Sequence, residues 1–222
     1  MRKIETICRI LILLLAVGAL FSCGSAGFTV NEIKIRGAIN SNVSSMKGIL
    51  KEVKGKNLII YPLGEIVGEL SKDPYVDFIR YEKVIPDILI INVYEKRVSG
   101  YCGNDKEHFS ILEDGTRVSS GPKGPIYFTF PKKLPTDNEI ENIIQNLYRI
   151  NIEATEVEIA PNYLKIVLAD GFLLLLERDI SNITNVKYMQ YIREKIAGNE
   201  GDGIVGLDMR YRGQSIMILG GK

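Results

Sequence analysis

The chain has 222 residues and is almost electrically neutral, with 28 basic and 27 acidic side chains and a formal charge of +1. The tip that ends at Gly27 holds three of the basic residues and one acidic residue, so the remainder carries a net charge of about −1. Such a surface has no basic field to attract nucleic acid, which excludes that class of partner. The 195 residues after the tip suffice for one large or two small domains with real cores.

The chain begins with a basic tip followed by a long uncharged segment. No charge lies between Arg9 and Glu32, and at helical rise the 21 residues 10–30 span about 31 Å, roughly one bilayer core. All three basic residues of the tip precede the apolar run, so the positive-inside rule leaves the tip in the cytoplasm and everything after Phe28 outside it. The sequence predicts an extracytoplasmic protein with a single-pass membrane anchor over residues 1–27.

Two other modes of export fit the same segment. Its strongly apolar part, Ile10 to Phe21, has only about the length of a signal-peptide core. Leu20-Phe21-Ser22-Cys23 resembles a bacterial lipobox, in which Cys23 is lipidated after cleavage, although Phe21 departs from the usual small or branched residue. An uncleaved anchor, a lipoprotein and a secreted protein would all export the same folded part.

The first half of that part alternates between strand and helix patterns. Gly37 ends the first strand, Asn42 and its neighbours supply capping groups for the first helix, and Asp73-Pro74 ends the second helix. The expected elements are a strand over 28–37, helices over 46–53 and 66–70, and strands over 76–84 and 88–95. The order β-α-α-β-β predicts an α+β unit with two helices on one face of a three-stranded mixed sheet.

The second half is richer in strands, which are separated by Gly, Asp and Pro. Turn signals occur at Glu113-Asp114-Gly115 and at Ala169-Asp170-Gly171, and apolar residues recur at helical spacing between Ile140 and Leu147. The expected elements are strands over 98–101, 109–112 and 126–130, a helix over 138–150, strands over 152–159, 163–168 and 172–176, a helical segment around 188–196, and a final hairpin of 204–210 and 214–219. This pattern predicts a β-rich sheet with flanking helices.

The sequence offers no convergent set of catalytic or metal-binding side chains. His108 is the only histidine and lies in the charged stretch 104–108, where we expect a solvated surface residue. Cys102 is the only cysteine beyond the anchor, so neither a disulfide framework nor a zinc site is available. We therefore expect no enzyme, no cofactor, no metal and no small-molecule substrate.

The final strand has two interpretations. At the edge of a sheet, the backbone of residues 214–219 would be open to a strand from another protein. In the centre of a sheet, Ile216 and Ile218 would simply be core residues. Residues 76–80, beside Asp73-Pro74, form another possible docking edge, although core packing is the expected role of Val76 and Phe78.

Several motifs, in their order along the chain, resemble the FtsQ/DivIB family of bacterial cell-division proteins. The matching segments are residues 28–37, 55–58, 73–76 and 86–95 for its POTRA domain, and 111–115, 168–172 and 205–211 for its C-terminal β domain. The resemblance implies an anchor over 1–27, a POTRA domain over 28–96 and the β domain over 97–222. The chain departs from the family in its short cytoplasmic tip, its near-absent spacer before Phe28 and its lack of a polar tail.

The resemblance also implies partners and a site. In this family the final strand and the Tyr before it form the docking site for a coiled-coil division protein, FtsB or DivIC, which adds a strand to the sheet. Arg210 and Tyr211 match the motif directly, whereas Ser215, Ile216, Met217 and Ile218 match the strand by location. FtsL-like proteins and, through the POTRA domain, other divisome proteins are further expected partners, at the septum of the cytoplasmic membrane. The alternative is a POTRA-containing periplasmic lipoprotein that acts in envelope protein assembly or secretion.

Intact-mass analysis of the protein purified from bacterial membranes distinguishes the modes of export. We expect the mass of the unprocessed chain from Met1 to Lys222. A mass that starts at diacylated Cys23 would contradict the single-pass anchor.

Overall fold

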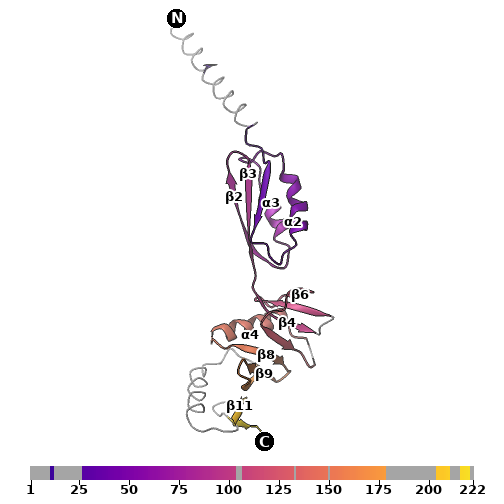
Figure 1. The fold of residues 1–222 in the computed structure, drawn as a ribbon, viewed down its shortest axis with the longest axis vertical. Helices are drawn as coiled ribbons and strands as arrows, with labels where there is room; N and C mark the ends of the chain where they lie inside the picture. The colour runs from indigo at the N-terminus through magenta and orange to yellow at the C-terminus, as the bar shows by residue number, and fades with distance from the viewer. Residues whose placement is uncertain are drawn as a thin grey trace. The chain divides into compact units, whose positions relative to one another are not determined.

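A computed structural model describes residues 11–12, 27–103, 107–132, 134–149, 151–178, 204–210 and 216–220. The chain divides into two compact units, with the boundary after Glu95 (Figure 1). Most of the expected anchor and the helical segment expected around 188–196 lie outside the described residues. Within the described part of the chain, no helix has the length and apolar character that a bilayer crossing requires.

The first unit is a three-stranded mixed sheet with helices on one side. Its elements are β1 (Glu32–Arg36), α2 (Val43–Leu50), the short 3₁₀ helix η1 (Lys51–Val53), α3 (Gly64–Leu70), β2 (Val76–Val84) and β3 (Ile88–Glu95). The strand order is β1-β3-β2, with β1 parallel and β2 antiparallel to the central β3. Figure 1 shows α2 and α3 on the same side of the sheet. The predicted element order and mixed sheet are confirmed.

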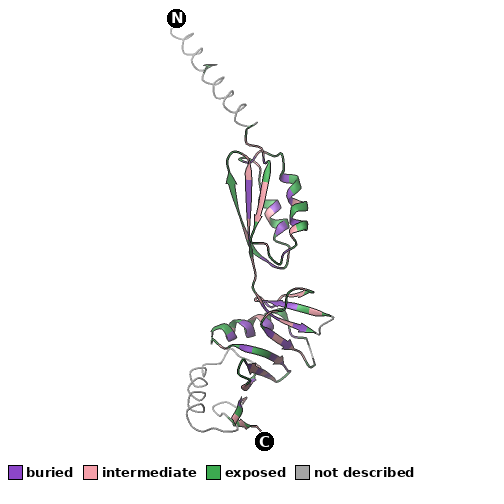
Figure 2. Cartoon of the chain, in the orientation of Figure 1, coloured by how far each residue is buried: buried purple, intermediate pink, exposed green. Residues whose placement is uncertain are grey.

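Apolar residues at helical spacing pack the two helices onto β3. Met46 and Leu50 of α2 and Leu70 of α3 are buried in one cluster with Leu89 and Ile91 of β3, and Figure 2 shows buried positions on the sheet and both helices. The first strand is shorter than expected, because β1 begins only at Glu32. The residues before it pair elsewhere: Thr29 forms an isolated bridge with Asn57.

The end of β3 holds the loop that leads into α2. Glu95 Oε1 accepts hydrogen bonds from the backbone N–H groups of Ile39, Asn40 and Ser41 at 2.8, 3.0 and 2.8 Å, and from Ser41 Oγ at 2.6 Å. Gly37 starts this loop with φ +81°, where a Cβ would collide with the Val93 carbonyl oxygen. The carboxylate of Glu95 therefore fixes the entry into the first helix.

The second unit is built on a nine-stranded sheet. Its elements are β4 (Val98–Gly103), β5 (His108–Leu112), β6 (Arg117–Ser119), β7 (Ile126–Thr129), α4 (Asp137–Arg149), β8 (Ala154–Ile159), β9 (Tyr163–Leu168), β10 (Leu173–Glu177), β11 (Ile204–Met209) and β12 (Ile216–Leu219). The strand order is β12-β11-β10-β9-β8-β7-β4-β5-β6. Parallel pairs join β4 to β7, β7 to β8 and β10 to β11. The expected β-rich mixed sheet is confirmed, and β6 is a strand that we did not expect.

Helix α4 covers the middle of this sheet. A reciprocal capping box begins the helix: Glu139 N–H donates to Thr136 Oγ1 at 3.3 Å, and Thr136 N–H donates to Glu139 Oε2 at 3.0 Å. Ile140 and Ile144 on the helix then pack in the same buried cluster as Phe128 of β7. The helical spacing from Ile140 to Leu147 therefore marked the face that packs on the sheet.

The Glu95→Gln variant should destabilise the first unit by about 1–2 kcal/mol near neutral pH, because it weakens several hydrogen bonds to a charged acceptor. Desolvation acts to raise the pKa of Glu95, but the hydrogen bonds from Ser41, Asn40 and Ile39 outweigh it and lower the pKa. The carboxylate therefore stabilises the fold fully above its ordinary pKa of about 4.3, and this contribution is lost as the pH falls through the lower folded value.

Hydrogen exchange of the α2 and β3 amides, followed as a function of urea concentration, measures the stability of the first unit separately from that of the second. The difference between Glu95→Gln and the native chain should shrink towards acidic pH, and Glu52→Gln, at an exposed position in η1, is the matched control. Equal protection in all three proteins at neutral pH would show that Glu95 does not hold the loop.

Candidate functional site

The last strand lies at the end of the nine-stranded sheet. β12 pairs antiparallel with β11, with Leu207 opposite Met217 and Asp208 opposite Ile216. No other strand of the described chain pairs with the outer side of β12. The antiparallel pairing expected of the last two strands is confirmed, and among the described residues β12 holds an edge position rather than a central one.

The side chains of β12 are poorly covered on both faces. Ile216, Met217 and Leu219 are 50, 56 and 72% exposed, and Ile218 is half-buried. Among the described residues, the buried core of the unit includes Leu207 of β11 but no residue of β12. β12 is therefore joined to the sheet mainly by its backbone, and most of its apolar surface is accessible.

Half-buried leucines of β10 lie in the same cross-strand rows as residues of β12, with β11 between them. The pairing registers place Leu173, Gly206 and Ile218 in one row across three strands, and Leu175, Asp208 and Ile216 in the next row. Leu173 and Leu175 are only half-buried. Gly206 and the buried carboxylate of Asp208 separate these leucines from β12, so the apolar surface beside the open backbone is that of β12 itself.

Arg210 is held by contacts within the chain where β11 ends. Its Nε donates to Asp208 Oδ1 at 2.9 Å and its Nη2 to Asp208 Oδ2 at 2.5 Å, while its guanidinium lies 5.7 Å from the centre of the Tyr163 ring. The hydrogen bond from Arg210 lowers the pKa of the buried Asp208, against desolvation, which raises it. The ion pair between Arg210 and Asp208 therefore fixes the backbone at the end of β11, and we call it the brace. The Arg210 side chain is 37% exposed.

The remaining predicted site residues are only partly described. Ile216, Met217 and Ile218 lie together on β12, next to the brace formed by Arg210 and Asp208. Tyr211 and Ser215 lie outside the described residues, as does Cys23. Sequence reasoning missed the contribution of Asp208: residues two apart in a strand lie on the same face, which permits the fork with Arg210 but does not by itself indicate it.

The other expected docking edge is formed by residues 76–80 on β2, where we expected Val76 and Phe78 to pack in the core. One of these two residues does not. Val76 is buried as expected, but Phe78 is 40% exposed and stacks on Tyr94 with ring centres 4.2 Å apart. The pairing register shifts between Val76 and Phe78, and this irregularity breaks the simple alternation of faces along β2. The expectation of a core role for Phe78 is therefore wrong.

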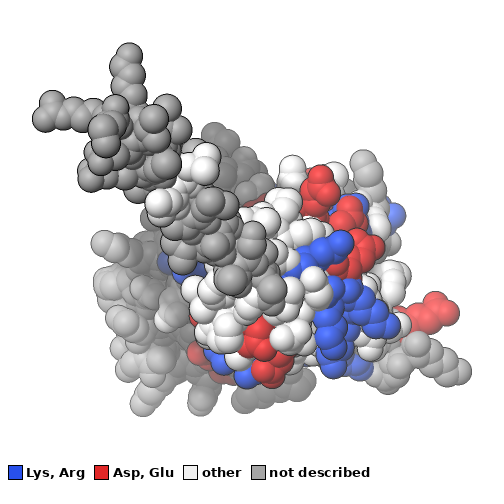
Figure 3. Space-filling view, turned by 90° about the horizontal axis from the view of Figure 1, so that it is seen from above, with Lys and Arg blue, Asp and Glu red and all other residues white. Residues whose placement is uncertain are grey.

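The structure also shows where His108 and Cys102, the histidine and cysteine of the second unit considered above, lie. His108 begins β5 and does not lie in a loop as expected; it is half-buried, and its Nε2 lies 2.7 Å from the Gly121 carbonyl oxygen. Cys102 is buried, and desolvation raises its pKa. Within the described residues, no three His, Cys, Asp or Glu side chains are grouped as metal ligands. Figure 3 shows acidic side chains beside basic ones on the face in view, so neither sign of charge covers it.

No family model matches the chain, and no curated protein matches it. Among solved structures, the chain is similar to the major extracytoplasmic domain of the cell-division protein DivIB from Geobacillus stearothermophilus, in its trans isomer. The identity is 14% and the TM-score 0.34, over 48% of this chain and 98% of that one. A likeness this weak establishes neither a shared fold nor a shared function.

The Asp208→Asn variant should loosen the β11–β12 hairpin, because an amide cannot replace both charged acceptors of the Arg210 fork. We expect a loss of about 1–2 kcal/mol in local stability, less than for a fully buried pair because Arg210 is partly in solvent. Hydrogen exchange of the β11 and β12 amides measures this loss. Glu156→Gln, at an exposed acid of β8, is the control, and unchanged exchange in Asp208→Asn would contradict the brace.

Proposed function

We propose that the protein is an extracytoplasmic scaffold of bacterial cell division, held at the cytoplasmic membrane by its N-terminal segment. It recruits a coiled-coil division protein, similar to FtsB or DivIC, by adding a strand of that partner to β12. The resemblance of the sequence motifs to FtsQ/DivIB supports the process, with residues 28–96 as a POTRA domain and 97–222 as the β domain. The edge position of β12 supports the mechanism.

The observation that carries the mechanism is the contrast between the two edges of the nine-stranded sheet. β6, at one edge, has three residues, and its Arg117 donates to Asp137 of α4 at 2.9 Å. Short, charged and tied to a helix, it has the features by which proteins protect an edge from another strand. β12, at the other edge, reads Ile-Met-Ile-Leu without a charge or a proline. β12 is only one residue longer than β6, so the contrast lies in its uncharged apolar side chains, which make it the edge better suited to a partner.

Apolar contacts would contribute most of the affinity. A partner strand would pair with about half of the backbone groups of β12, and each hydrogen bond contributes about 0.5–1.5 kcal/mol net. Full burial of a side chain such as Ile216 or Leu219 contributes about 1.5–3 kcal/mol. Association itself costs at least about 4 kcal/mol. Anchoring both proteins in one membrane raises their effective concentration, so an interface of this size is sufficient.

Tyr211 would complete the site. By the family resemblance, the Tyr before the final strand contacts the coiled-coil partner, and Tyr is a rigid, amphipathic residue suited to such a contact. The two hydrogen bonds between Arg210 and Asp208 fix the position of Arg210, the residue directly before Tyr211. The protein would then assemble partners without transforming a substrate, and FtsL-like and other divisome proteins would join the same assembly.

Site-specific photo-crosslinking in dividing cells tests this proposal. A photoreactive residue in place of Met217 should crosslink to a single-pass coiled-coil division protein, which mass spectrometry identifies. Ile60 is the matched control, because it is an exposed apolar residue of the first unit, 78% exposed. In the Tyr211→Ala background the crosslink at Met217 should fall several-fold, while the thermal unfolding of the chain stays unchanged.

Two results would contradict the proposal. One is the absence of any crosslink from Met217 to a division protein, and the other is an equally strong crosslink to that protein from Ile60. A crosslink from Met217 that persists in full in Tyr211→Ala would remove Tyr211 from the site but leave β12 in place.

A further inference from the structure

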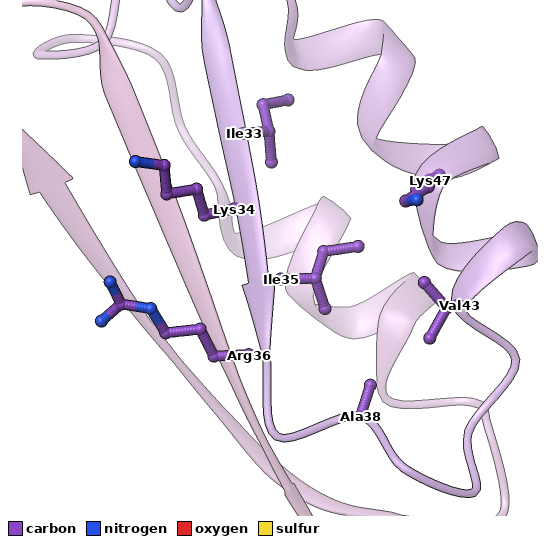
Figure 4. A pocket seen from close by; sticks show the side chains of 7 residues that line it. All are labelled: Ile33, Lys34, Ile35, Arg36, Ala38, Val43 and Lys47. Carbon is purple, nitrogen blue, oxygen red and sulfur yellow. The ribbon is translucent and has the colours of Figure 1, made fainter.

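A groove runs along the first unit between β1 and α2 (Figure 4). It has a volume of about 510 Å³, within the range of peptide- and ligand-sized clefts. Four half-buried apolar side chains line it, from Ile33, Ile35, Ala38 and Val43. Lys34, Arg36 and Lys47 also border it, the first two with side chains on the opposite face of the sheet, and no acidic residue borders it. The site is separate from β12 and does not depend on the function proposed above.

The backbone of β1 is open along this groove. β1 pairs with β3 on one side, and no other strand of the described residues pairs with its outer side. The N–H of Glu32 bonds to the Asp87 carbonyl oxygen on the β3 side. Because backbone groups alternate along a strand, those of Ile33 and Ile35 point away from β3.

The open stretch has a defined beginning. The residues before β1 are already paired on that side, because Val30 N–H bonds to the Lys56 carbonyl and Gly55 N–H bonds to the Val30 carbonyl. No such pairing continues along β1 among the described residues. A visiting strand would therefore have the whole of β1, Glu32 to Arg36, to pair with.

The two faces of β1 offer different chemistry to a neighbouring strand. Figure 4 shows Ile33 and Ile35 pointing towards the helices, and Lys34 and Arg36 pointing to the opposite face of the sheet. Side chains of adjacent strands meet on the same face, so a visiting strand would meet apolar groups on one face and basic groups on the other. On the helix side, Lys47 of α2 adds a basic group at the rim of the groove.

We propose that this groove binds an extended segment of another protein in which apolar and acidic residues alternate. The apolar side chains would pack on Ile33, Ile35 and Val43, and the acidic ones would face Lys34 and Arg36. Lys34 pairs with Glu32 at 3.3 Å, a solvent-exposed contact of little energy. Arg36 and Lys47 form no ion pair with a described acid, so their charge is available to a partner.

The basic residues also distinguish the binding preference of β1 from that of β12. β12 is uncharged and apolar on both faces, so it selects no charge in its partner. A β12 strand from a second copy of this chain offers no acid to Arg36 and therefore does not match the groove. The two open edges would thus select different partners, one by apolar contacts alone and one by alternating charge.

Fluorescence anisotropy on the full chain tests this assignment with two peptides of about six residues, a length typical of a strand. One alternates Ile with Glu, and the other alternates Ile with Lys. We expect the Ile/Glu peptide to bind at least about tenfold more tightly than the Ile/Lys peptide. N-methylation of alternate amides along one side of the Ile/Glu peptide should abolish its binding, and methylation along the other side should not.

Charge-reversal variants show which part of the chain binds the peptide. The double variant Lys34→Glu and Arg36→Glu should weaken the Ile/Glu peptide at least about tenfold and strengthen the Ile/Lys peptide. The control double variant, Lys51→Glu and Lys54→Glu, makes the same change in net charge at exposed positions outside the groove. Equal affinity for both peptides, binding that survives methylation on either side, or equal effects of the two double variants would overturn the proposal.

Discussion

Hydrogen bonding between strands holds both units together, and it cannot be completed at the ends of an open sheet. The nine-stranded sheet ends at β6 and β12, and the three-stranded sheet ends at β1 and β2. These edge strands differ in length, contacts and exposure. β6 is short and tied through Arg117 to α4, whereas β12 leaves four apolar residues exposed or half-exposed and β1 borders a groove. The incomplete ends are therefore the places where this fold can bind other chains.

Most of the elements follow from local sequence patterns. The spacing from Ile140 to Leu147 predicted α4, and Ala169-Asp170-Gly171 predicted the turn between β9 and β10. The differences arise where local patterns carry little information. β6 has only three residues, two of them polar, which is too short for an alternating pattern. Phe78 faces away from the core because one irregularity in the register changes the phase of β2, and a single strand contains no signal for it.

The candidate sites needed information that no single segment contains. Whether β12 lies at an edge depends on its pairing with β11, and on β11 lying parallel to the preceding strand β10, from which residues 178–203 separate it. The sequence indicated that residues 214–219 form a strand but left edge and centre equally open. Arg210 stood out in the sequence as part of a motif, whereas the fork with Asp208 that explains its geometry became visible only in the structure. The groove beside β1 likewise results from packing between β1 and α2.

We propose that the protein works through two of these open sheet edges, which differ in chemistry: β12 is apolar, and β1 carries basic residues. The central claim is that β12 accepts a strand from a division partner. Hydrogen–deuterium exchange on the full chain, with and without the coiled-coil partner identified by crosslinking, tests this claim most directly. The account predicts that the amides of Ile216 to Leu219 gain protection in the complex while those of β6, at the opposite edge, do not. A complex that leaves exchange in β12 unchanged would contradict it.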